Sequence, residues 1–291
     1  MTEPFSNIGS PQGGIRVLTL NLAARNGKWP ERRSVLIKGI KALQPDLMAF
    51  QEVIKNGEYD QVTDLLGMGY YITHQKNRTA DGMGISIASR WPLGDVKELD
   101  LQVTPRTANF PAAALIAEVY TPDAGTLLFV NHFPNWQLNF EYERELQTVK
   151  TARFIEQYIE KNKLQVILVG DMDADPEASS IRFLSGRQSM DSTSVCYRDA
   201  WESIHSDEAG HTFTPVNTFV SEQVIKGTKP FRDWPFRRID YIFVRFGEHG
   251  GPALDIIACE RIFYKPLNHV WASDHFGLVA DLAASKFIEP I

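Results

Sequence analysis

The sequence predicts a layered α/β fold in which two mixed β-sheets are stacked face to face and flanked by helices. Roughly ten short apolar or alternating segments indicate strands, and two longer segments carry the periodicity of amphipathic helices. Some strands follow one another directly and others are separated by helical stretches, which is typical of mixed sheets. Since about ten strands would make one very wide sheet, two stacked sheets are favoured.

The N-terminal third of the chain predicts strands and one helix. Residues 15–21 (IRVLTLN) form an apolar run that ends in an amide, as expected for a strand. Residues 31–44 carry apolar side chains three and four positions apart, which predicts an amphipathic helix that stops near Pro45. The next strands are predicted over residues 46–53, which are apolar until a Gln-Glu pair, and over residues 83–93, which a proline breaks.

The middle of the chain predicts a hairpin followed by the longest helix. Residues 112–120 and 126–133 are two strands joined by the turn TPDAG, so they should be neighbours in one sheet. Residues 140–161 place apolar side chains on one face and charged side chains on the other. Residues 203–235 are polar and weakly periodic, and we expect them to form surface loops.

The segment 166–175 (VILVGDMDAD) predicts a buried strand that ends in three carboxylates at alternate positions. Asp175 and Pro176 fit the N-cap and first residue of a short helix that continues to Leu184. Function concentrates at such strand ends, because the backbone is rigid there while the side chains face an open crevice. Three more strands are predicted over residues 237–246, 254–263 and 276–282.

Length and composition indicate a globular protein with a sizeable core. The chain has 291 residues, 43% of them hydrophobic, and a net charge of -6. This charge argues against a broad basic face for nonspecific nucleic-acid binding. We expect a single domain over residues 15–285 after a disordered or extended segment over residues 1–14, because no repeat or charged linker divides the chain.

Cysteine usage and hydropathy predict a cytoplasmic location. Only Cys196 and Cys259 occur, and we expect two buried thiols rather than a disulfide framework or a metal knuckle. The first residues lack a basic region and an apolar core, and no run of roughly eighteen apolar residues predicts a transmembrane segment. No obligate protein partner is indicated.

Several familiar site types are excluded for the acidic segment. A calcium-binding EF-hand loop starting at Asp171 would need Gly at its sixth position and Glu at its twelfth, where the chain has Pro176 and Arg182. The sequence contains no GxxxxGK[ST] or GxGxxG nucleotide-binding loop and no GxSxG serine-hydrolase motif. The GNH and GHxH segments of binuclear metallophosphoesterases are also absent.

Ionisable or amide side chains recur at the edges of the predicted strands. Any one of them alone has an ordinary structural explanation, such as a turn-forming Asn or a solvated Glu. Their recurrence indicates one site, and the oxygen-rich set suits Mg²⁺ or Mn²⁺, whereas zinc would favour Cys pairs or an HExxH helix. The residues are Asn21, Glu52, His132, Asp171, Asp173, Asp240, Asp274 and His275.

The ordered segments LTLNL, FQEV, NHF, VGDMDA, RRIDYIFV and ASDHFGLVADL resemble the endonuclease/exonuclease/phosphatase superfamily. This superfamily includes deoxyribonuclease I, abasic-site endonucleases, inositol-polyphosphate 5-phosphatases and neutral sphingomyelinases. The resemblance covers about residues 15–282 and implies a deoxyribonuclease I-like four-layer sandwich of two mixed sheets between helices. It also implies an enzyme that hydrolyses a phosphodiester or phosphomonoester by in-line attack of water.

The resemblance further implies a metal-assisted site. Glu52 matches the principal ligand of Mg²⁺ or Mn²⁺, with Asn21 beside it and Asp274 bordering the metal. Asp171 matches the carboxylate that activates the attacking water. The divalent ion would stabilise negative charge on the phosphoryl group.

Two histidines complete the implied machinery. His275, oriented by Asp240, would donate a hydrogen bond or positive charge to the phosphoryl group. The carboxylate partner favours the protonated form of the ring. His132 is similar to the family's other histidine, near the scissile phosphate.

Two positions depart from the family pattern. The family usually has Asn where this chain has Asp173, and an ionised carboxylate only accepts hydrogen bonds and repels a phosphate. Asp173 is therefore expected to be protonated, to bind metal or to face away. Abasic-site nucleases tend to carry Asp where this chain has Ala23, which disfavours a repair nuclease. The alternative to an enzyme is a noncatalytic binding protein that retained the fold.

Substrate recognition is expected in loops that combine basic and aromatic side chains. Such loops can hold a nucleic-acid backbone and stack bases, or hold a phosphorylated small molecule or lipid headgroup. Nuclease and small-molecule phosphatase are therefore equally favoured. The substrate-binding candidates are Arg25, Arg78, Trp136, Trp234, Arg237 and Trp271.

Overall fold

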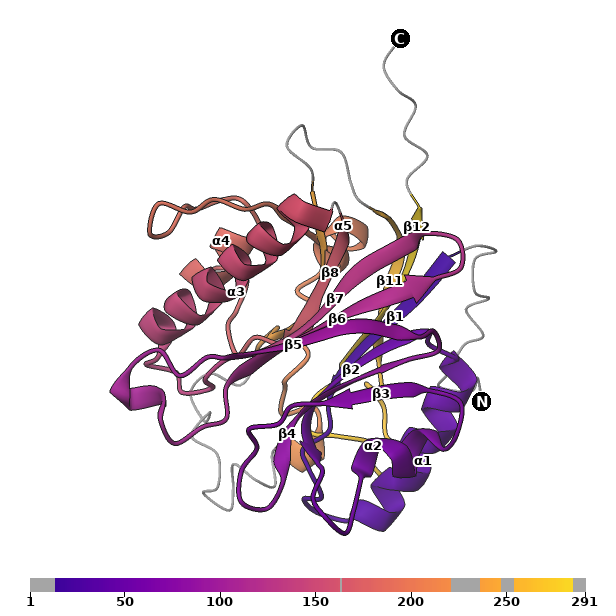
Figure 1. Ribbon diagram of the computed structural model, residues 1–291. Coiled ribbons are helices and arrows are strands. Elements are labelled where there is room, and N and C mark those ends of the chain that lie inside the picture. The colour runs from indigo at the N-terminus through magenta and orange to yellow at the C-terminus, as the bar shows by residue number, and fades with distance from the viewer. Residues whose placement is uncertain (1–13, 163, 221–235, 247–253, 285–291) are drawn as a thin grey trace.

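The computed structural model describes residues 14–162, 164–220, 236–246 and 254–284. Within these residues, two sheets of six strands each are stacked face to face between helices (Figure 1). The predicted fold class of two mixed sheets flanked by helices is confirmed. The predicted segment 1–14 lies outside the described residues except for Gly14, and the single domain over 15–285 stays a prediction.

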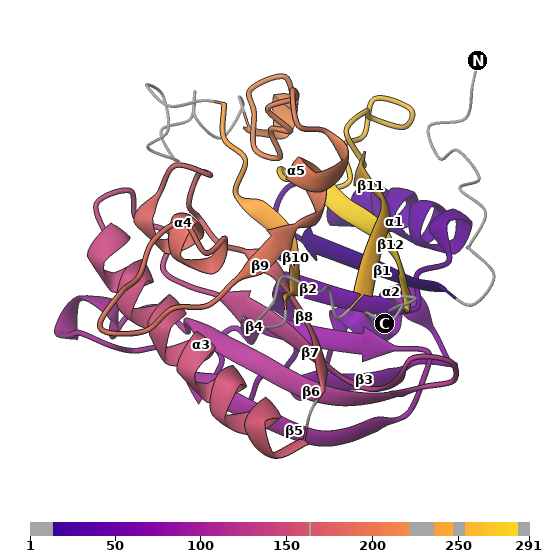
Figure 2. The same ribbon diagram turned by 90° about the horizontal axis from the view of Figure 1, so that it is seen from above.

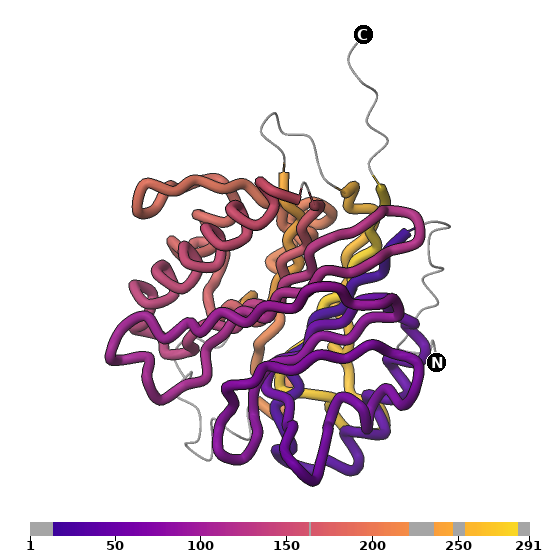
Figure 3. Tube along the Cα trace, in the orientation of Figure 1, coloured from indigo at the N-terminus to yellow at the C-terminus, as the bar shows by residue number. Residues whose placement is uncertain are grey.

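The first sheet combines strands from both ends of the chain in the order β11-β12-β1-β2-β4-β3. The first strand, β1, pairs parallel with β2 and antiparallel with β12. The Cα trace in Figure 3 shows the yellow C-terminal strands beside the indigo N-terminal ones. The bounds are β1 Gly14–Asn21, β2 Leu47–Ile54, β3 Tyr71–His74, β4 Met83–Ser89, β11 Leu254–Ile262 and β12 Gly277–Ala284.

The second sheet has the order β5-β6-β7-β8-β10-β9. The predicted hairpin forms β6 and β7, which pair antiparallel, and β7 runs parallel to β8 after the long helix. The bounds are β5 Leu93–Asp100, β6 Ala113–Thr121, β7 Gly125–Phe133, β8 Gln165–Asp171, β9 Tyr197–Asp199 and β10 Asp240–Arg245.

The helices cover both outer faces of the sandwich, as the view in Figure 2 shows. Helices α1 and α2 pack on the first sheet through residues such as Leu36 and Val62, and α3 and α4 pack on the second through residues such as Ile155 and Ile181. The bounds are α1 Trp29–Leu43, α2 Gln61–Leu66, α3 Glu141–Asn162, α4 Ser179–Leu184 and α5 Ala200–Ile204, with a 3-10 turn over Pro105–Thr107.

The main core lies between the two sheets. Val17 and Leu278 of the first sheet meet Phe129 and Ile242 of the second, and all four side chains are fully buried. Burial on both faces explains why the central strands are apolar almost throughout rather than alternating. Trp201 of α5 joins this core as well.

Several predicted boundaries were wrong. The predicted strand 83–93 is two strands in different sheets, because β4 ends at Ser89 and β5 begins at Leu93. The helix predicted from Asp175 begins only at Ser179. Cys196 is exposed rather than buried, whereas Cys259 is buried as predicted. The short elements α2, β3, β9 and α5 had not been predicted.

Candidate active site

The ends of four strands meet at one edge of the sandwich. Asp171 ends β8, and Asp240 begins the antiparallel strand β10 directly opposite it. Asn21 ends β1, and His275 precedes β12, which pairs with β1. The pairing of the strands therefore brings together side chains that are up to 254 positions apart along the chain.

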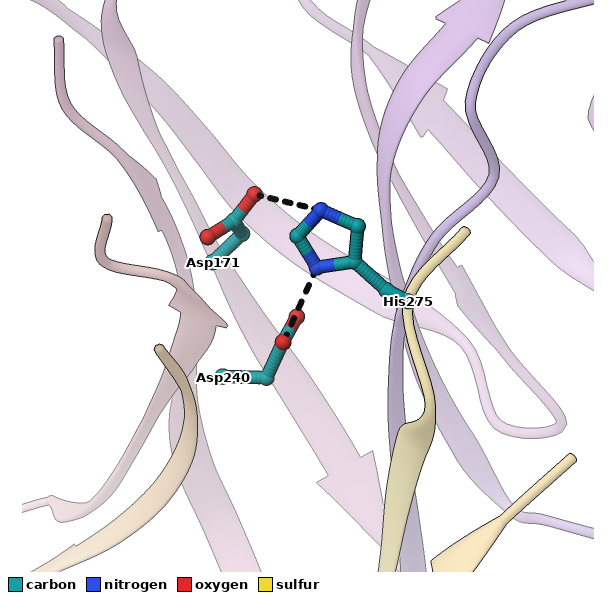
Figure 4. A group of neighbouring side chains, drawn as sticks. All are labelled: Asp171, Asp240 and His275. Carbon is teal, nitrogen blue, oxygen red and sulfur yellow. Dashed lines mark hydrogen bonds and ion pairs between the residues drawn. The ribbon is translucent and has the colours of Figure 1, made fainter. Parts of the chain in front are cut away.

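His275 lies between two carboxylates (Figure 4). Its Nδ1 is 3.0 Å from Oδ2 of Asp240, a hydrogen bond that fixes the ring. Its Nε2 is 3.8 Å from Oδ2 of Asp171, which is too long for a hydrogen bond. The imidazole is thus oriented by Asp240, while its Nε2 is left to face Asp171 and the space beside it.

The electrostatic surroundings keep His275 protonated at neutral pH. Burial of the ring disfavours its charged form, but the carboxylates of Asp240 and Asp171 outweigh burial and raise the pKa of His275 to about 10. Burial, followed by the negative charge of Asp173, raises the pKa of Asp171 well above its ordinary value, while His275 acts in the opposite direction. The ring therefore carries the positive charge of this group of side chains.

Asn21 links the carboxylates of the two sheets. Its Nδ2 donates to Oδ2 of Asp171 at 2.9 Å and to Oε1 of Glu52 at 3.2 Å. Its Oδ1 accepts from the backbone N–H of Ala23. In this arrangement Asn21 orients two acids, and its role as a metal ligand stays a prediction.

An irregularity in β2 directs Glu52 toward the site. Glu52 has a φ of 49°, and the pairing of β2 with β4 shifts register between Phe50 and Val53. A non-glycine residue in the left-handed region is uncommon, and bulges of this kind re-aim side chains next to active sites. Glu52 accordingly lines the same pocket as Asp171.

Asp274 is fully buried beside this group. Its Oδ1 accepts from the hydroxyl of Ser273, which also donates to the backbone carbonyl of Asn21. The segment before β12 is thereby tied to the end of β1. Asp274 is not among the residues that line the pocket.

Asp173 faces the pocket and is buried, at 5% exposure. Burial raises its pKa to about 6, while Arg237 and Arg144 act in the opposite direction. Of the three expectations for this residue, facing away is wrong. Its backbone also lies in the left-handed region, with a φ of 50°.

Asp175 has a different role from the predicted helix cap. Its carboxylate accepts from Nε of Arg237 at 3.2 Å and from the backbone N–H of Arg238 at 3.1 Å. These bonds pull it toward the segment before β10, so it is not available to begin a helix at Pro176. Arg237 is itself buried and lines the pocket.

The acids open into a pocket of about 350 Å³. Glu52, Asp171, Asp173, His275 and Arg237 supply its charged side chains. Aromatic and apolar side chains form the other walls, among them Met83, Phe110, Trp136 and Phe213. The volume lies within the range of small-molecule sites, which are mostly apolar with a few convergent polar groups.

His132 is placed away from this pocket, contrary to the sequence-based role. The preceding residue, Asn131, points between the sheets, where it bonds Gln51. Because side chains alternate along a strand, His132 points to the other face, where its Nδ1 lies 3.1 Å from the hydroxyl of Thr151 on α3. Burial lowers the pKa of His132 to about 3, so the ring is neutral.

Only some of the substrate-binding candidates line the pocket. Trp136 and Arg237 line the pocket. Arg78 does not, because its guanidinium donates to backbone carbonyls such as those of Val53 and Ile85 and to Ser86 Oγ, which makes it a structural residue of its loop. The remaining three are placed as follows: Arg25 is exposed above the ring of Tyr59, Trp271 bonds Thr218 beside a separate small pocket, and Trp234 lies outside the described residues.

Two buried arginines near the site were not predicted. Arg32 of α1 is 2% exposed and donates to the backbone carbonyls of Asn26 and Ala272, on two sides of the site. Arg144 of α3 is 4% exposed and contributes positive charge near Asp173. Each lies on a helix among other charged residues, so its spacing alone does not distinguish it from a solvated surface charge.

The donor set fits a divalent cation. Asp171, Asp240 and His275 each offer a ligand atom within 4.8 Å of the others, and Glu52 adds a further carboxylate across Asn21. His275 is less suited to bind metal, because its Nδ1 bonds Asp240 and its pKa, raised to about 10, favours the protonated ring. The carboxylates of Glu52 and Asp171 are the hard oxygen donors that Mg²⁺ and Mn²⁺ prefer.

Comparison with known proteins identifies the family of this chain. The sequence matches the Endonuclease/Exonuclease/phosphatase family over residues 18–275. It is 24% identical over 276 residues to Nocturnin of Rattus norvegicus, which covers 89% of this chain and 60% of that protein. The chain thus spans about three fifths of the length of this curated relative.

Solved structures share the fold. The catalytic domain of human Nocturnin with a bound sulfate anion superposes with a TM-score of 0.70 at 20% identity, over 94% of each chain. TDP2 of D. rerio complexed with single-strand DNA product gives a TM-score of 0.70 at 19% identity, over 94% of this chain and all of that one. The deoxyribonuclease I-like sandwich implied by the sequence is confirmed.

Proposed function

The chain belongs to the endonuclease/exonuclease/phosphatase family of phosphoester hydrolases, and from that premise we propose that it hydrolyses a compact phosphoester in the pocket at the strand ends. The observation that carries the proposal is the ordered group of Asp240, His275 and Asp171, which opens into that pocket. A carboxylate, an imidazolium and a second carboxylate in this order supply a proton acceptor beside a fixed positive charge.

Each residue of the group has a role that follows from its contacts. Asp171 accepts the proton of the attacking water, since Asn21 holds one of its oxygens and it lines the pocket. His275 donates from Nε2 to a phosphoryl oxygen, and its positive charge is sustained by Asp240. Arg237 adds a second positive charge to the pocket.

A divalent cation, Mg²⁺ or Mn²⁺, is proposed at Glu52, with the buried Asp274 bordering the site. When bound, the ion supplies Lewis-acid stabilisation of the negative charge on the phosphoryl oxygens. Asn21 donates to both carboxylates and so holds Glu52 beside Asp171.

The shape of the pocket favours a small substrate over a duplex. A volume of about 350 Å³ with apolar walls accommodates a phosphoryl group and a compact alcohol. A net charge of -6 also disfavours broad contact with a polyanion. A single-stranded nucleic-acid end is the second candidate, because the D. rerio TDP2 structure of the same fold holds single-strand DNA product.

The experiment is a hydrolysis assay with Mg²⁺ or Mn²⁺ against small phosphomonoesters, small phosphodiesters, and single-stranded and duplex oligonucleotides. We expect small esters to be hydrolysed fastest and EDTA to abolish turnover. Asp171→Asn and His275→Gln should each lower kcat by about two to four orders of magnitude, because each removes a group that transfers or stabilises charge.

Glu177→Gln is the matched control, because Glu177 is an exposed acid six residues from Asp171. It should leave kcat and KM unchanged. Turnover that survives EDTA and both site substitutions would contradict the proposal. The absence of turnover on every substrate, together with retained phosphate binding, would favour the noncatalytic binding protein instead.

A further inference from the structure

Asp173 is a buried carboxylate that the reaction described above does not use. It lines the pocket at 5% exposure. Within the described part of the chain, its two hydrogen bonds are both made by its backbone, and its side chain takes part in no hydrogen bond or ion pair. Because the residue lines the pocket, its carboxylate is placed to bond a ligand that binds there.

The backbone of Asp173 is fixed from both sides. Its N–H donates to Oδ1 of Asp171 at 3.2 Å, and its carbonyl accepts from Nη2 of Arg237 at 2.8 Å. The residue is held in the left-handed region, with a φ of 50°. The constrained backbone fixes the direction of the Cα–Cβ bond of Asp173 relative to the pocket, as a binding group requires.

The surroundings of Asp173 do not favour a metal ligand. Arg237 and Arg144 both act on it with positive charge, so the carboxylate is already compensated without a divalent ion. Among the described residues, the atoms grouped within 4.8 Å as potential ligands belong to Asp171, Asp240 and His275 and not to Asp173. These same positive charges, together with His275, allow a phosphoryl group to approach despite the carboxylate.

An ionised carboxylate can only accept hydrogen bonds, so a ligand group that binds the side chain of Asp173 must be a donor. We propose that Asp173 determines specificity by accepting a hydrogen bond from a hydroxyl or ammonium group that the substrate carries next to its scissile phosphoester. The inference rests on the proposed function and narrows the substrate to amino- or hydroxyl-bearing alcohols. An amide at this position would not discriminate, since it both donates and accepts.

The test compares two esters that differ only in the donor, 2-aminoethyl phosphate and ethyl phosphate, and the corresponding 4-nitrophenyl diesters. At pH 8 the wild type should prefer the aminoethyl ester in kcat/KM by about 10- to 100-fold, as expected for a hydrogen bond to a charged group. In Asp173→Asn the preference should fall to within about threefold. An equal preference in both proteins, or none in the wild type, would overturn the inference.

Asp173→Asn should fold, because Asn has nearly the same shape and tolerates a left-handed backbone. Circular dichroism and the melting temperature establish this before the comparison. Glu177→Gln removes one negative charge from the same segment at an exposed position and should keep the wild-type preference.

Calorimetric binding of the two phosphomonoesters separates this inference from the proposed function. A binding preference that Asp173→Asn abolishes supports the role of Asp173 even if no ester is hydrolysed. Hydrolysis with a preference that Asp173→Asn leaves unchanged overturns the inference and leaves the proposed function standing. A Mn²⁺ titration completes the test: a tenfold or greater loss of Mn²⁺ affinity in Asp173→Asn would make the residue a metal ligand instead.

Discussion

At the scale of single residues, the charge of the candidate site depends on whether the ring of His275 is protonated. His275 is buried between Asp240 and Asp171, and a neutral ring there would leave two carboxylates with little compensation. The protonated ring is therefore part of the folded structure, and its pKa of about 10 lies far above the ordinary value of 6.5. The charge that stabilises the fold here is the same charge that the proposed reaction uses.

Asp240→Asn should make stability less dependent on pH. A pKa raised in the folded state contributes stability that is fully present below about pH 6.5 and is lost as the pH rises through about 10. Removing the Asp240 charge lowers the pKa of His275 toward its unfolded value, so less stability remains to be lost. Urea unfolding at pH 6, 8 and 10 should show a smaller decline than in the wild type, by on the order of a few kcal/mol.

The contribution of Asp171 changes with pH in the same direction, and removing the Asp240 charge also lessens the rise in the pKa of Asp171, so both groups make the decline smaller. Asp255→Asn is the control, because Asp255 lies on β11 away from the site. If Asp240→Asn and the wild type lose equal stability over this interval, Asp240 does not sustain the charge on the ring.

At the scale of elements, the site depends on how closely β7 and β8 approach each other. Gly170 has a φ of 148°, and a Cβ added there would lie 2.0 Å from the backbone oxygen of His132. Asp171 follows directly, so the glycine that ends the apolar run also sets where the carboxylate of Asp171 emerges.

Gly170→Ala should therefore destabilise the fold and disturb the site. The added methyl group must displace the backbone of β7, which costs about 1–3 kcal/mol or more. We expect a lower free energy of unfolding by urea and a lower kcat. Gly57→Ala is the matched control, since a Cβ there meets nothing within 4 Å. A Gly170→Ala protein as stable as the control would mean that β7 and β8 separate freely.

Elements with strong local signals were predictable from sequence. The hairpin of β6 and β7 and the helix α3 begin and end within one residue of the prediction, because apolar periodicity and turn residues define them locally. The crossing from β4 to β5 was missed, since an apolar run does not reveal that its two halves belong to different sheets. Short elements such as α2 and β9 carry too few residues for a periodic signal.

At the scale of the whole molecule, a buried ion pair joins the first described strand to the last. Nε and Nη2 of Arg16 on β1 bond the two carboxylate oxygens of Asp281 on β12 at 2.7 and 2.8 Å, and Nη1 reaches the carbonyl of Leu43. Both side chains are at most 5% exposed. Asn21 lies at the end of β1, and His275 lies just before β12. The ion pair between these two strands therefore helps to fix Asn21 relative to His275.

Asp281→Leu should destabilise the protein by about 3–5 kcal/mol, because it leaves the Arg16 charge buried without its partner. The double substitution Arg16→Met with Asp281→Leu should recover most of that loss. Denaturant unfolding of these two variants, of Arg16→Met alone and of the wild type gives the coupling energy. Lys97→Ala, which breaks an exposed pair with Asp95, should cost no more than about 1 kcal/mol. A cost of this size for Asp281→Leu as well would show that the buried pair contributes little.

None of the described helices is both long and apolar enough to cross a membrane. Buried apolar residues form three layers of core, one between the sheets and one under the helices on each side. This layered burial is what holds the strand ends at one edge and makes a pocket there possible.

The sequence by itself determined the layered α/β class and the acids and histidines at strand ends, because both follow from local patterns of apolar and polar residues. Only the tertiary structure decided which of those side chains meet. His132 turns to α3 and Arg78 is bound to the carbonyl of Val53 on β2, whereas Asp173 enters the pocket. The direction of a side chain depends on which face of its strand is covered, and hydrogen-bond partners come from residues far along the chain. Such long-range contacts leave no local signal in a single sequence.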